Sequence, residues 1–568
     1  MKRTVISYLI YTAFLFLVFY LFLPFINLHS VGFYFYLVLV FGFIFSIIVY
    51  AIKDRLIQKD YAKNKKYFTF KFNKSIGQFV RKQTDLAKKY QIKNTIFRLT
   101  GLVLLVVIAF ITILGIFGSK LFSAERYYKQ LEIKSSPITE YEEIFDFDDG
   151  SVALPVIDKE LAFKLAQAKL SIYGAQYQID YENFTLISVT RNAKDELLRI
   201  APLEYSNLFV SLSRLNKGTI GYVEVNVITK EAKLVEISEG LKYMPTAKFS
   251  KDLDRHIRFA YPTVMYEQKY FEIDDEGNPY WVIPTITKEI ALINGKNTKG
   301  LFLVNPINGE IKKYNIGEEP KWVDRVVVDT LVEIQATNAL RYKHGYFNAV
   351  LGQKKEVFQV SDGYNYFIKD GHTYYVSCVT SPNEADQTSI GFLTIDLKNK
   401  DATMYSIPGI TEMRAREIAM QKEEVKAQNL EATWPILINF NGVPTYFLVL
   451  KNEVQDQRIV FINVENGSII AMEDSMQKAK ESYKELLLNS GQTETEKHTL
   501  TGNVSEFRVY NNEIYFTISG TDGYFIVDFD LNKDTIFINL NDNVTFTYII
   551  SSKDGKNYNS VIEFKKNS

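Results

Sequence analysis

Two patterns of apolar residues divide the chain near residue 120. Before it, three stretches of 22, 22 and 21 residues carry no charged side chain: 5–26, 31–52 and 99–119. A helix of about 20 apolar residues crosses the hydrocarbon core of a bilayer and satisfies its own backbone there. After residue 120, apolar residues alternate in short runs between Gly, Asn and Asp, which is typical of strands and turns. The pattern predicts three transmembrane helices followed by a sheet-rich region.

The distribution of charge predicts how these helices are oriented. The loop 53–97 holds 13 Lys and Arg against three Asp, whereas the link between the first two stretches holds none. Short loops rich in Lys and Arg lie on the cytoplasmic side. A signal peptide is disfavoured, because its apolar core runs only about 7–15 residues. We therefore expect a cytoplasmic amino terminus and residues 120–568 outside the plasma membrane, with the basic loop against anionic lipid headgroups.

One hairpin pattern occurs four times after residue 150. Its copies are 221–237, 300–316, 391–407 and 460–473. A small polar residue precedes each turn, at intervals of 79, 91 and 67 residues: Asn226, Asn305, Asp396 and Asn463. The Asn-Gly pairs 308–309 and 466–467 predict tight turns with positive φ.

Further strands and helices surround these hairpins. A second hairpin precedes three of them, at 270–283, 366–378 and 436–450, while the first copy is less regular, with an insertion between strands. Each repeat is therefore expected to hold about four antiparallel strands. Apolar residues at helical spacing predict a helix before each sheet and one after the last. The expected starts are Asp158, Ser250, Pro320, Thr411 and Ser475. This alternation favours tandem α+β units over a β-propeller.

The repeated hairpin resembles the PepSY-type module of bacterial envelope proteins. The residues that carry the resemblance are Val223–Glu231, Phe302–Glu310, Leu393–Asp401 and Phe461–Gly467. The whole arrangement is similar to multi-pass membrane proteins of Gram-positive bacteria with long exported carboxyl-terminal regions. PepSY modules are binding or inhibitory units of exported peptidases and envelope sensors, so the resemblance implies a binding role.

The last segment has a different pattern, with five or six short strands and no strong helix. It resembles a small barrel of the OB-fold type. Residues 499–568 hold six Lys and Arg against nine Asp and Glu. Because nucleic-acid binding relies on positive charge, we expect no nucleic-acid partner. The aromatic residues of the segment are interpreted as core and strand-face packing. They are Phe507, Tyr510, Tyr515, Phe516, Tyr524 and Phe525.

These patterns divide the chain into a membrane-anchored multidomain protein. The expected parts are the anchor 1–120, an acidic linker 121–157, α+β repeats at 158–245, 246–318, 319–409 and 410–490, and a barrel at 498–568.

The sequence carries no signature of catalysis or metal binding. The five His residues, at 29, 256, 344, 372 and 498, form no zinc motif, and Cys378 is the only cysteine. No catalytic serine motif or nucleotide-binding glycine loop is present. Two acidic clusters, 140–149 and 272–276, lack the spacing of a calcium loop and are interpreted as linker and turn. We assign no catalytic, cofactor-binding or metal residues.

The sequence therefore predicts a non-enzymatic cell-envelope protein. Its role would be binding, scaffolding or regulation, with an exported protein or an envelope polymer as the partner. One alternative is an accessory subunit of a membrane transport or secretion complex. The other is a hydrolase whose active site has no recognisable motif.

Overall fold

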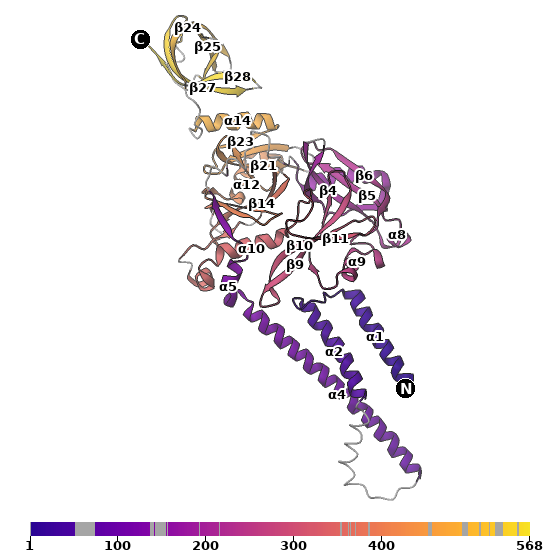
Figure 1. The fold of residues 1–568 in the computed structure, drawn as a ribbon. Helices are drawn as coiled ribbons and strands as arrows, with labels where there is room; N and C mark the ends of the chain where they lie inside the picture. The colour runs from indigo at the N-terminus through magenta and orange to yellow at the C-terminus, as the bar shows by residue number, and fades with distance from the viewer. Residues whose placement is uncertain are drawn as a thin grey trace.

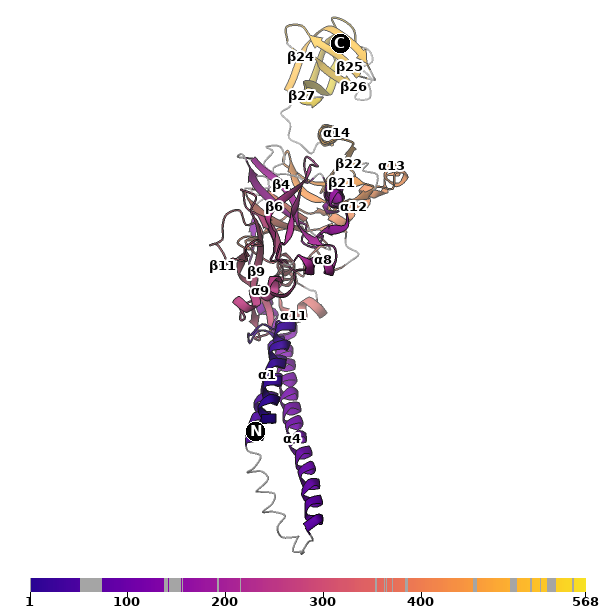
Figure 2. The same cartoon turned by 90° about the vertical axis from the view of Figure 1, so that its right-hand side faces the viewer.

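The computed structural model of the chain describes most of its residues. The described ranges are 2–51, 74–136, 141, 155, 157–191, 194–214, 216–352, 355–361, 363, 365–369, 371–383, 387–452, 457–490, 498–510, 513–521, 523–528, 538–553 and 556–567. Figures 1 and 2 show three long helices at one end of the molecule, a body of sheets and helices in the middle, and a small barrel at the other end.

The three long helices are α1 (Lys2–Phe22), α2 (Val31–Ala51) and α4 (Lys74–Phe117). Among the described residues, two segments are long and apolar enough to cross a membrane, Val31–Val49 and Ile96–Phe117. The apolar part of α1 is shorter, because the helix ends two residues before Pro24. The first transmembrane span, expected at 5–26, therefore stays a prediction.

Helix α4 corrects the expected boundary of the basic loop. It is 44 residues long and begins at Lys74, so residues 74–97 of the expected loop are helical. The segment from Gln78 to Arg98 contains neither Gly nor Pro and many Lys, Arg, Gln, Ala and Leu, which are good helix formers. Residues 52–73 lie outside the described part of the chain.

The segment expected as an acidic linker is partly structured. Helix α5 (Lys120–Tyr128) follows α4, and β1 (Ile133–Ser136) pairs in parallel with a strand of the third sheet, β17 (Ala402–Tyr405). Tyr141 is fully buried, and its hydroxyl donates to the Ile438 carbonyl at 2.6 Å. The rest of the acidic cluster 140–149 lies outside the described residues.

Four consecutive sheets make up the body, and each defines a unit with the helix that precedes it. Unit 1 consists of α7 (Lys159–Leu170), η1 (Ser171–Gln176), β2 (Tyr177–Ile179), β3 (Thr185–Arg191), β4 (Lys194–Tyr205), α8 (Leu208–Ser213), β5 (Thr219–Asn226) and β6 (Ala232–Leu241). Unit 2 consists of η2 (Phe249–Lys251), α9 (Leu253–Ala260), β7 (Met265–Tyr266), β8 (Tyr270–Ile273), β9 (Pro279–Ile290), β10 (Asn294–Val304) and β11 (Ile311–Asn315).

The other two units follow the same plan. Unit 3 consists of α10 (Asp329–Arg341), α11 (Gly345–Phe347), η3 (Asn348–Gly352), β12 (Gln359–Val360), β13 (Asn365–Lys369), β14 (His372–Thr380), β16 (Gly391–Asp396) and β17. Unit 4 consists of α12 (Glu412–Gln421), α13 (Glu423–Ala427), β19 (Glu431–Ala432), β20 (Ile436–Phe440), β21 (Val443–Lys451), β22 (Gln457–Asn463) and β23 (Ile470–Glu473). Two short strands, β15 (Thr388–Ser389) and β18 (Gly409–Ile410), pair with each other, and α14 (Met476–Asn489) follows unit 4.

The four units share one strand order. In each unit, the long third strand pairs on one side with the fourth strand. On its other side it pairs with the first two strands, which lie end to end. The strand orders are β2-β4-β5-β6, β7-β9-β10-β11, β12-β14-β16-β17 and β19-β21-β22-β23, and the second strands are β3, β8, β13 and β20. Each unit therefore has five strands rather than the expected four. Unit 1 is as regular as the others, and the expected insertion is its long strand β4.

The helix of each unit packs on the same face of its sheet. This face carries the residue directly before the polar turn residue: Val225 with α7, Val304 with α9, Ile395 with α10 and Ile462 with α12. The opposite face of unit 1 packs against α9 and the sheet of unit 2, and the opposite face of unit 3 packs against α12 and the sheet of unit 4. The body thus consists of a first half, units 1 and 2, and a second half, units 3 and 4.

Two of the expected helix starts are wrong. Helix α9 is capped by Asp252, whose carboxylate accepts the Arg255 N–H, rather than by Ser250. Helix α10 begins at Asp329 rather than at Pro320, because Val323 and Val326 lie in an extended segment that covers the outer face of the unit 2 sheet. The starts after Asp158, Thr411 and Ser475 are confirmed by their side-chain caps.

The repeated turns do not have the expected backbone. Gly309 has positive φ, but Asn308, Asn466 and Gly467 do not. In units 1 to 3 the residue with positive φ comes four after the polar residue, and its N–H donates to the carbonyl of that residue. These are four-residue loops ended by a left-handed residue, and Lys230 and Lys400 take that conformation where unit 2 has glycine.

The polar residue before each turn binds the turn backbone. The side chains of Asn226, Asn305, Asp396 and Asn463 each accept one or two backbone N–H groups of the loop that follows. Their recurrence is explained by turn formation, since Asn and Asp commonly stabilise turns in this way.

The carboxyl-terminal segment forms a closed five-stranded barrel. Its strands are β24 (His498–Tyr510), β25 (Glu513–Ile518), β26 (Phe525–Asp528), β27 (Asn543–Lys553) and β28 (Lys556–Lys566). Phe516 and Phe525 lie in the barrel core, whereas Tyr524 is exposed. Core packing therefore accounts for only part of the aromatic residues in the barrel.

Candidate functional site

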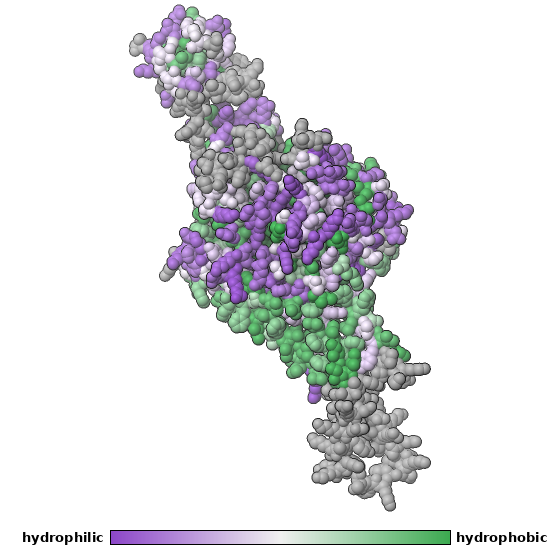
Figure 3. Space-filling model, in the orientation of Figure 1, coloured by the Kyte–Doolittle hydropathy of each residue, from purple (hydrophilic) through white to green (hydrophobic). Residues whose placement is uncertain are grey.

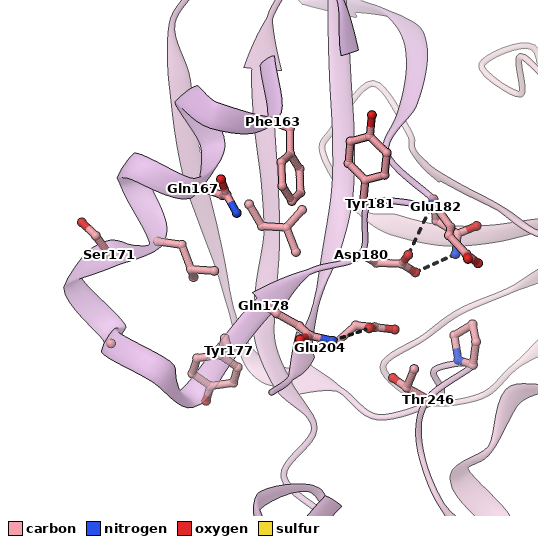
Figure 4. A pocket seen from close by; sticks show the side chains of 15 residues that line it. Phe163, Gln167, Ser171, Tyr177, Gln178, Asp180, Tyr181, Glu182, Glu204 and Thr246 are labelled. Carbon is pink, nitrogen blue, oxygen red and sulfur yellow. Dashed lines mark hydrogen bonds between the residues drawn. The ribbon is translucent and has the colours of Figure 1, made fainter. Parts of the chain in front are cut away.

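A cleft of about 650 Å³ opens on unit 1, between the helix and the first strand of its sheet. Helix α7 and the turn η1 form one wall, and β2 with the residues after it forms the other. Figure 4 shows side chains from these elements converging on the cleft. The cleft exists because η1 carries the chain away from the sheet before β2 joins its edge.

The electrostatic character of the cleft is acidic. Asp180, Glu182 and Glu204 line it, and none of the described residues that line it is Lys or Arg. Asp180 and Glu204 are both more than nine-tenths buried. Burial raises the pKa of Glu204, and the neighbouring charge of Asp180 raises it further. A positive charge stabilises acidic groups that lie close together, so these groups favour a cationic ligand beside them.

The protein holds the two buried carboxylates through short local contacts. Asp180 accepts the backbone N–H of Asn183 at 3.2 Å and its side-chain amide at 2.6 Å. Gln178 lies opposite Glu204 across the β2–β4 pair and donates to its carboxylate at 3.3 Å. These bonds fix the orientation of the two carboxyl groups at the floor of the cleft (Figure 4).

Aromatic rings add a second kind of surface to the cleft. Phe163 on α7 and Tyr181 meet edge to face with ring centroids 4.8 Å apart. The Lys159 ammonium group lies 4.5 Å above the Tyr181 ring. Tyr177 stacks on Tyr205 at 5.5 Å. Carboxylates beside aromatic faces suit a ligand that carries ammonium or guanidinium groups on an apolar stem.

A second cavity, of about 720 Å³, lies where the two halves of the body meet. Unit 1 contributes Ser188 and Thr190, the segment before α10 contributes Lys321 and Asp324, and unit 3 contributes His372, among others. Acidic and basic side chains are mixed here, so the cavity has no single preferred charge of ligand.

A pair of buried carboxyl groups lies beside this second cavity. Glu272 and Asp324 are 1% and 2% exposed, and the Asp324 N–H donates to Glu272 Oε2 at 2.9 Å. Asp324 Oδ2 accepts the Ser188 N–H at 2.7 Å, whereas Glu272 Oε1 has no hydrogen-bond partner among the described residues. Burial raises the pKa of both groups, and for Glu272 the charge of Asp324 adds to the effect.

Arginines share this region with the carboxyl pair. Arg325 Nη1 lies 3.0 Å from Asp329 Oδ2, which also accepts the Tyr366 hydroxyl at 2.7 Å. Arg199 is half-buried, and the loss of water around its guanidinium lowers its pKa to about 10. The junction between the halves is thus built from ionisable groups that are removed from water.

The residues of the acidic cluster 272–276 lie in two different environments. Asp274 accepts the Asn278 N–H at 2.7 Å and shapes the turn, and Gly277 has positive φ there, as interpreted from the sequence. Glu272, in contrast, points into the buried junction. Within the described ranges, no group of three or more His, Cys, Asp or Glu side chains could hold a metal ion.

The other residues considered in the sequence occupy separate places. His372 Nδ1 lies 2.7 Å from Asp396 Oδ2, at the end of β14, and His256 contacts the Gly309 carbonyl in unit 2. Cys378 is fully buried between units 3 and 4, and its N–H donates to Glu412 at 2.6 Å. His372 lines the second cavity. His256 and Cys378 line neither cavity, and the structure does not bring the three residues together.

Sequence patterns did not reveal the cleft. Its residues come from a three-residue strand, a turn and a helix end, and none of these forms a motif. The cluster "IDYEN" at 179–183 is the local signal in the sequence, with acidic residues on both sides of a tyrosine, and Glu204 lies opposite the preceding Gln178 across the sheet.

No protein-family model and no curated protein matches the sequence. Seven solved chains match part of the structure. A chain of the S. pombe Stn1–Ten1 complex is 17% identical, and the match covers 12% of this chain and 57% of that chain with a TM-score of 0.12. The Ifi202 HINa domain in complex with 20bp dsDNA is 11% identical, and the match covers 24% and 90% with a TM-score of 0.11. Similarities of this size carry no functional argument.

Proposed function

We propose that the chain is a membrane-anchored protein of the bacterial cell envelope that presents PepSY-like units outside the plasma membrane and binds a cationic partner there. The observation that carries this proposal is the contact between the α1–α2 link and unit 2. Because of this contact, the sheets lie at one set of ends of the apolar helices.

Three residues of the link between α1 and α2 are hydrogen-bonded to unit 2. The Ile26 N–H donates to the Pro262 carbonyl at 2.8 Å, and the Asn27 amide donates to the Thr263 carbonyl at 2.7 Å. His29 Nδ1 lies 2.6 Å from the Leu292 carbonyl. Arg258, on α9, lies over the Phe25 ring at 3.3 Å from its centroid.

The end of α4 meets the same part of unit 2. The Asn294 side chain donates to the Leu114 carbonyl at 3.3 Å, one turn before α4 ends. All three apolar helices therefore have one set of ends against unit 2, and Figure 1 shows the opposite set pointing away from the body. If the helices span a bilayer, the sheets and the α1–α2 link share one side of it.

The charges then indicate which side that is. Lys2 and Arg3 begin α1, and the basic residues from Lys74 onward begin α4, so both groups lie at the helix ends that point away from unit 2. Basic residues remain in the cytoplasm. This supports an extracytoplasmic position for the sheets and the barrel.

The binding role is based on the cleft of unit 1. Its carboxylates create a negative potential in a partly enclosed space, which attracts positively charged groups and strengthens their binding. A basic segment of an exported protein, or an amine-bearing envelope polymer, has the required chemistry. The Thr246 hydroxyl lies beside the Glu204 carboxylate in the cleft, and the binding proposal rests on the buried acidic groups there.

Cysteine labelling in intact cells tests the topology. Cys378 is fully buried and gives little background with a membrane-impermeant maleimide. We expect Val509→Cys, on an exposed barrel position, to be labelled in intact cells, and Lys88→Cys only after permeabilisation. Labelling of Lys88→Cys but not of Val509→Cys in intact cells would reverse the proposed orientation.

Peptide binding by the purified full chain tests the cleft. We expect a fluorescent oligolysine peptide to bind the natural chain, with an affinity that falls as salt is raised. The Glu182→Gln and Glu204→Gln variants should each bind the peptide several-fold more weakly. The matched control is Glu424→Gln, an exposed acidic position on α13. Equal affinity of all three variants for the peptide would remove the cleft as the binding site.

A further inference from the structure

Helix α5 begins two residues after the end of α4. Only Gly118 and Ser119 separate Phe117 from Lys120. If α4 crosses the bilayer, α5 must begin at the membrane surface, because two residues extend the chain by less than about 8 Å. The position of α5 next to lipid thus follows from chain connectivity.

The first turn of α5 exposes two large apolar side chains, and its second turn exposes Glu125 and Arg126. Leu121 is 42% exposed and Phe122 is 60% exposed. The other side packs against unit 3: Ala124 is buried in a small cluster with Tyr342 and Ala349. This packing places the short helical segment 345–352 next to α5.

The segment 345–352 exposes further large apolar side chains. Phe347 is 65% exposed, Val350 is 45% exposed and Leu351 is 77% exposed. Figure 3 shows hydrophobic surface continuing from the long helices onto the adjacent edge of the body, whereas most of the remaining visible surface of the body is hydrophilic. We call α5 and residues 345–352 together the apolar foot.

The apolar foot also contains residue types found at membrane interfaces. Tyr127, Tyr128 and Tyr346 are partly buried within it, and the Lys120 ammonium group lies 5.6 Å from the Tyr342 ring centroid. Tyrosine is enriched where lipid headgroups meet the acyl chains, and Lys is attracted by anionic headgroups. Burial lowers the pKa of Lys120, and the nearby Arg341 lowers it further.

We propose that the apolar foot inserts its exposed side chains into the outer leaflet of the membrane that α4 crosses, and so fixes the orientation of the body on the bilayer. The inference rests on the proposed membrane anchoring. An exposed apolar patch of this kind marks a surface that contacts another molecule. Because the apolar foot is continuous with α4, which is proposed to cross the bilayer, we expect that molecule to be lipid.

The test uses the full-length protein in vesicles of phosphatidylcholine and phosphatidylglycerol. Single cysteines carry an environment-sensitive fluorophore at Phe347→Cys and Leu351→Cys. The positive control is Leu105→Cys, at an exposed position in the middle of the apolar part of α4, and the negative control is Val509→Cys in the barrel. Quenching by lipids with nitroxides at the headgroup or along the acyl chain reports the depth of each probe.

We expect the Phe347→Cys and Leu351→Cys probes to be blue-shifted and quenched most by shallow nitroxides, and the Leu105→Cys probe by deep ones. If Leu105→Cys is quenched but the two foot probes behave like Val509→Cys, the foot does not contact lipid and this inference fails while the anchor remains. If Leu105→Cys is not quenched either, the membrane anchor itself is wrong. Foot probes that are blue-shifted without lipid quenching would show that protein, such as a second copy of the chain, covers the foot.

Discussion

The contacts inside each half of the body differ in kind from the contacts between the halves. Inside the first half, the sheets of units 1 and 2 meet through apolar side chains, with Trp281 and Phe302 fully buried. Inside the second half, Tyr446 and Phe392 occupy the corresponding interior. Between the halves, an apolar cluster that includes Ile286 and Leu331 is accompanied by charged and polar contacts. Lys451 lies 2.5 Å from Asp158 Oδ2, and Lys400 Nζ donates to Asn297 Oδ1 at 2.7 Å.

This difference indicates which contacts of the body can respond to pH and salt while each half stays folded. Apolar interiors lose their packing when a side chain is removed, and the cost is large at any pH. Charged contacts between halves depend on protonation and salt. We therefore expect the halves to be stable bodies and their junction to respond to conditions.

The largest expected effect comes from breaking an interior. Trp281→Ala removes a fully buried side chain whose Nε1 donates to the Tyr243 carbonyl at 3.0 Å. The free energy of unfolding of the first half should fall by about 3–5 kcal/mol. Phe209→Ala, at a position that is 83% exposed, is the matched control. Denaturant unfolding measures both variants, and equal midpoints would contradict the assigned interior.

Equivalent turns in the two halves should differ in their tolerance of a larger side chain. Gly309, in unit 2, has a φ of +83°, and a Cβ there would lie 2.4 Å from the Tyr243 ring. Gly467, in unit 4, lacks positive φ, and its Cβ would meet the end of the flexible Ile418 side chain. Gly309→Val should cost about 1–3 kcal/mol.

Gly467→Val should cost less than Gly309→Val, which corrects the sequence-based expectation that both turns need glycine equally. The thermal midpoint of each variant gives the comparison. A larger loss for Gly467→Val would show that the turns of the two halves were assigned wrongly.

The junction should depend on pH through its buried carboxyl pair. Burial raises the pKa of Glu272 and Asp324 in the folded state above the unfolded value of about 4. The folded state therefore binds protons more tightly, and stability falls as pH rises from about 4 through the raised pKa values. Each unit of pKa shift corresponds to about 1.4 kcal/mol.

Glu272→Gln removes one of these titrations, and its amide oxygen can still accept the Asp324 N–H. The variant should lose less stability than the natural chain between about pH 5 and about pH 9. Urea unfolding at both pH values measures this difference. An unchanged pH dependence would show that the pair is not charged at high pH or that it titrates equally in the unfolded chain.

The smallest expected effect is the loss of one ion pair between the halves. Lys451→Met removes the contacts with Asp158 and Glu160 and should cost no more than about 1 kcal/mol at low salt. Lys478→Met, in an exposed pair with Asp474 at the start of α14, is the control. The effect of Lys451→Met should shrink as salt is added. A cost that is independent of salt would indicate lost packing of the lysine stem instead.

Much of the fold was predictable because its signals are local. The four hairpins repeat, and Asn226, Asn305, Asp396 and Asn463 occupy equivalent places because a turn needs an acceptor at that point. The helix caps at Asp158, Thr411 and Ser475 and the closed barrel were predictable for the same reason. Units 2 to 4 were located from strand alternation alone.

The elements that the sequence did not predict have patterns that are too short to recognise or that are typical of a different element. The first strand of each unit has only two or three residues, fewer than any periodicity requires. Strand β4 was hidden by the charged residues at its start and by Pro202 within it. The segment 320–328 has the apolar spacing of a helix, but Val323 and Val326 bury against the unit 2 sheet in an extended form.

The sequence by itself determined the apolar helices with their charged flanks, the repeated unit and the barrel, because each depends on neighbouring residues. Only the tertiary structure decided how these parts meet. It set the α1–α2 link against unit 2 and brought Glu272 beside Asp324, 52 residues away along the chain. It also opened the acidic cleft between α7 and β2. These placements depend on which faces exclude water together, and that is a property of the packed chain rather than of any segment.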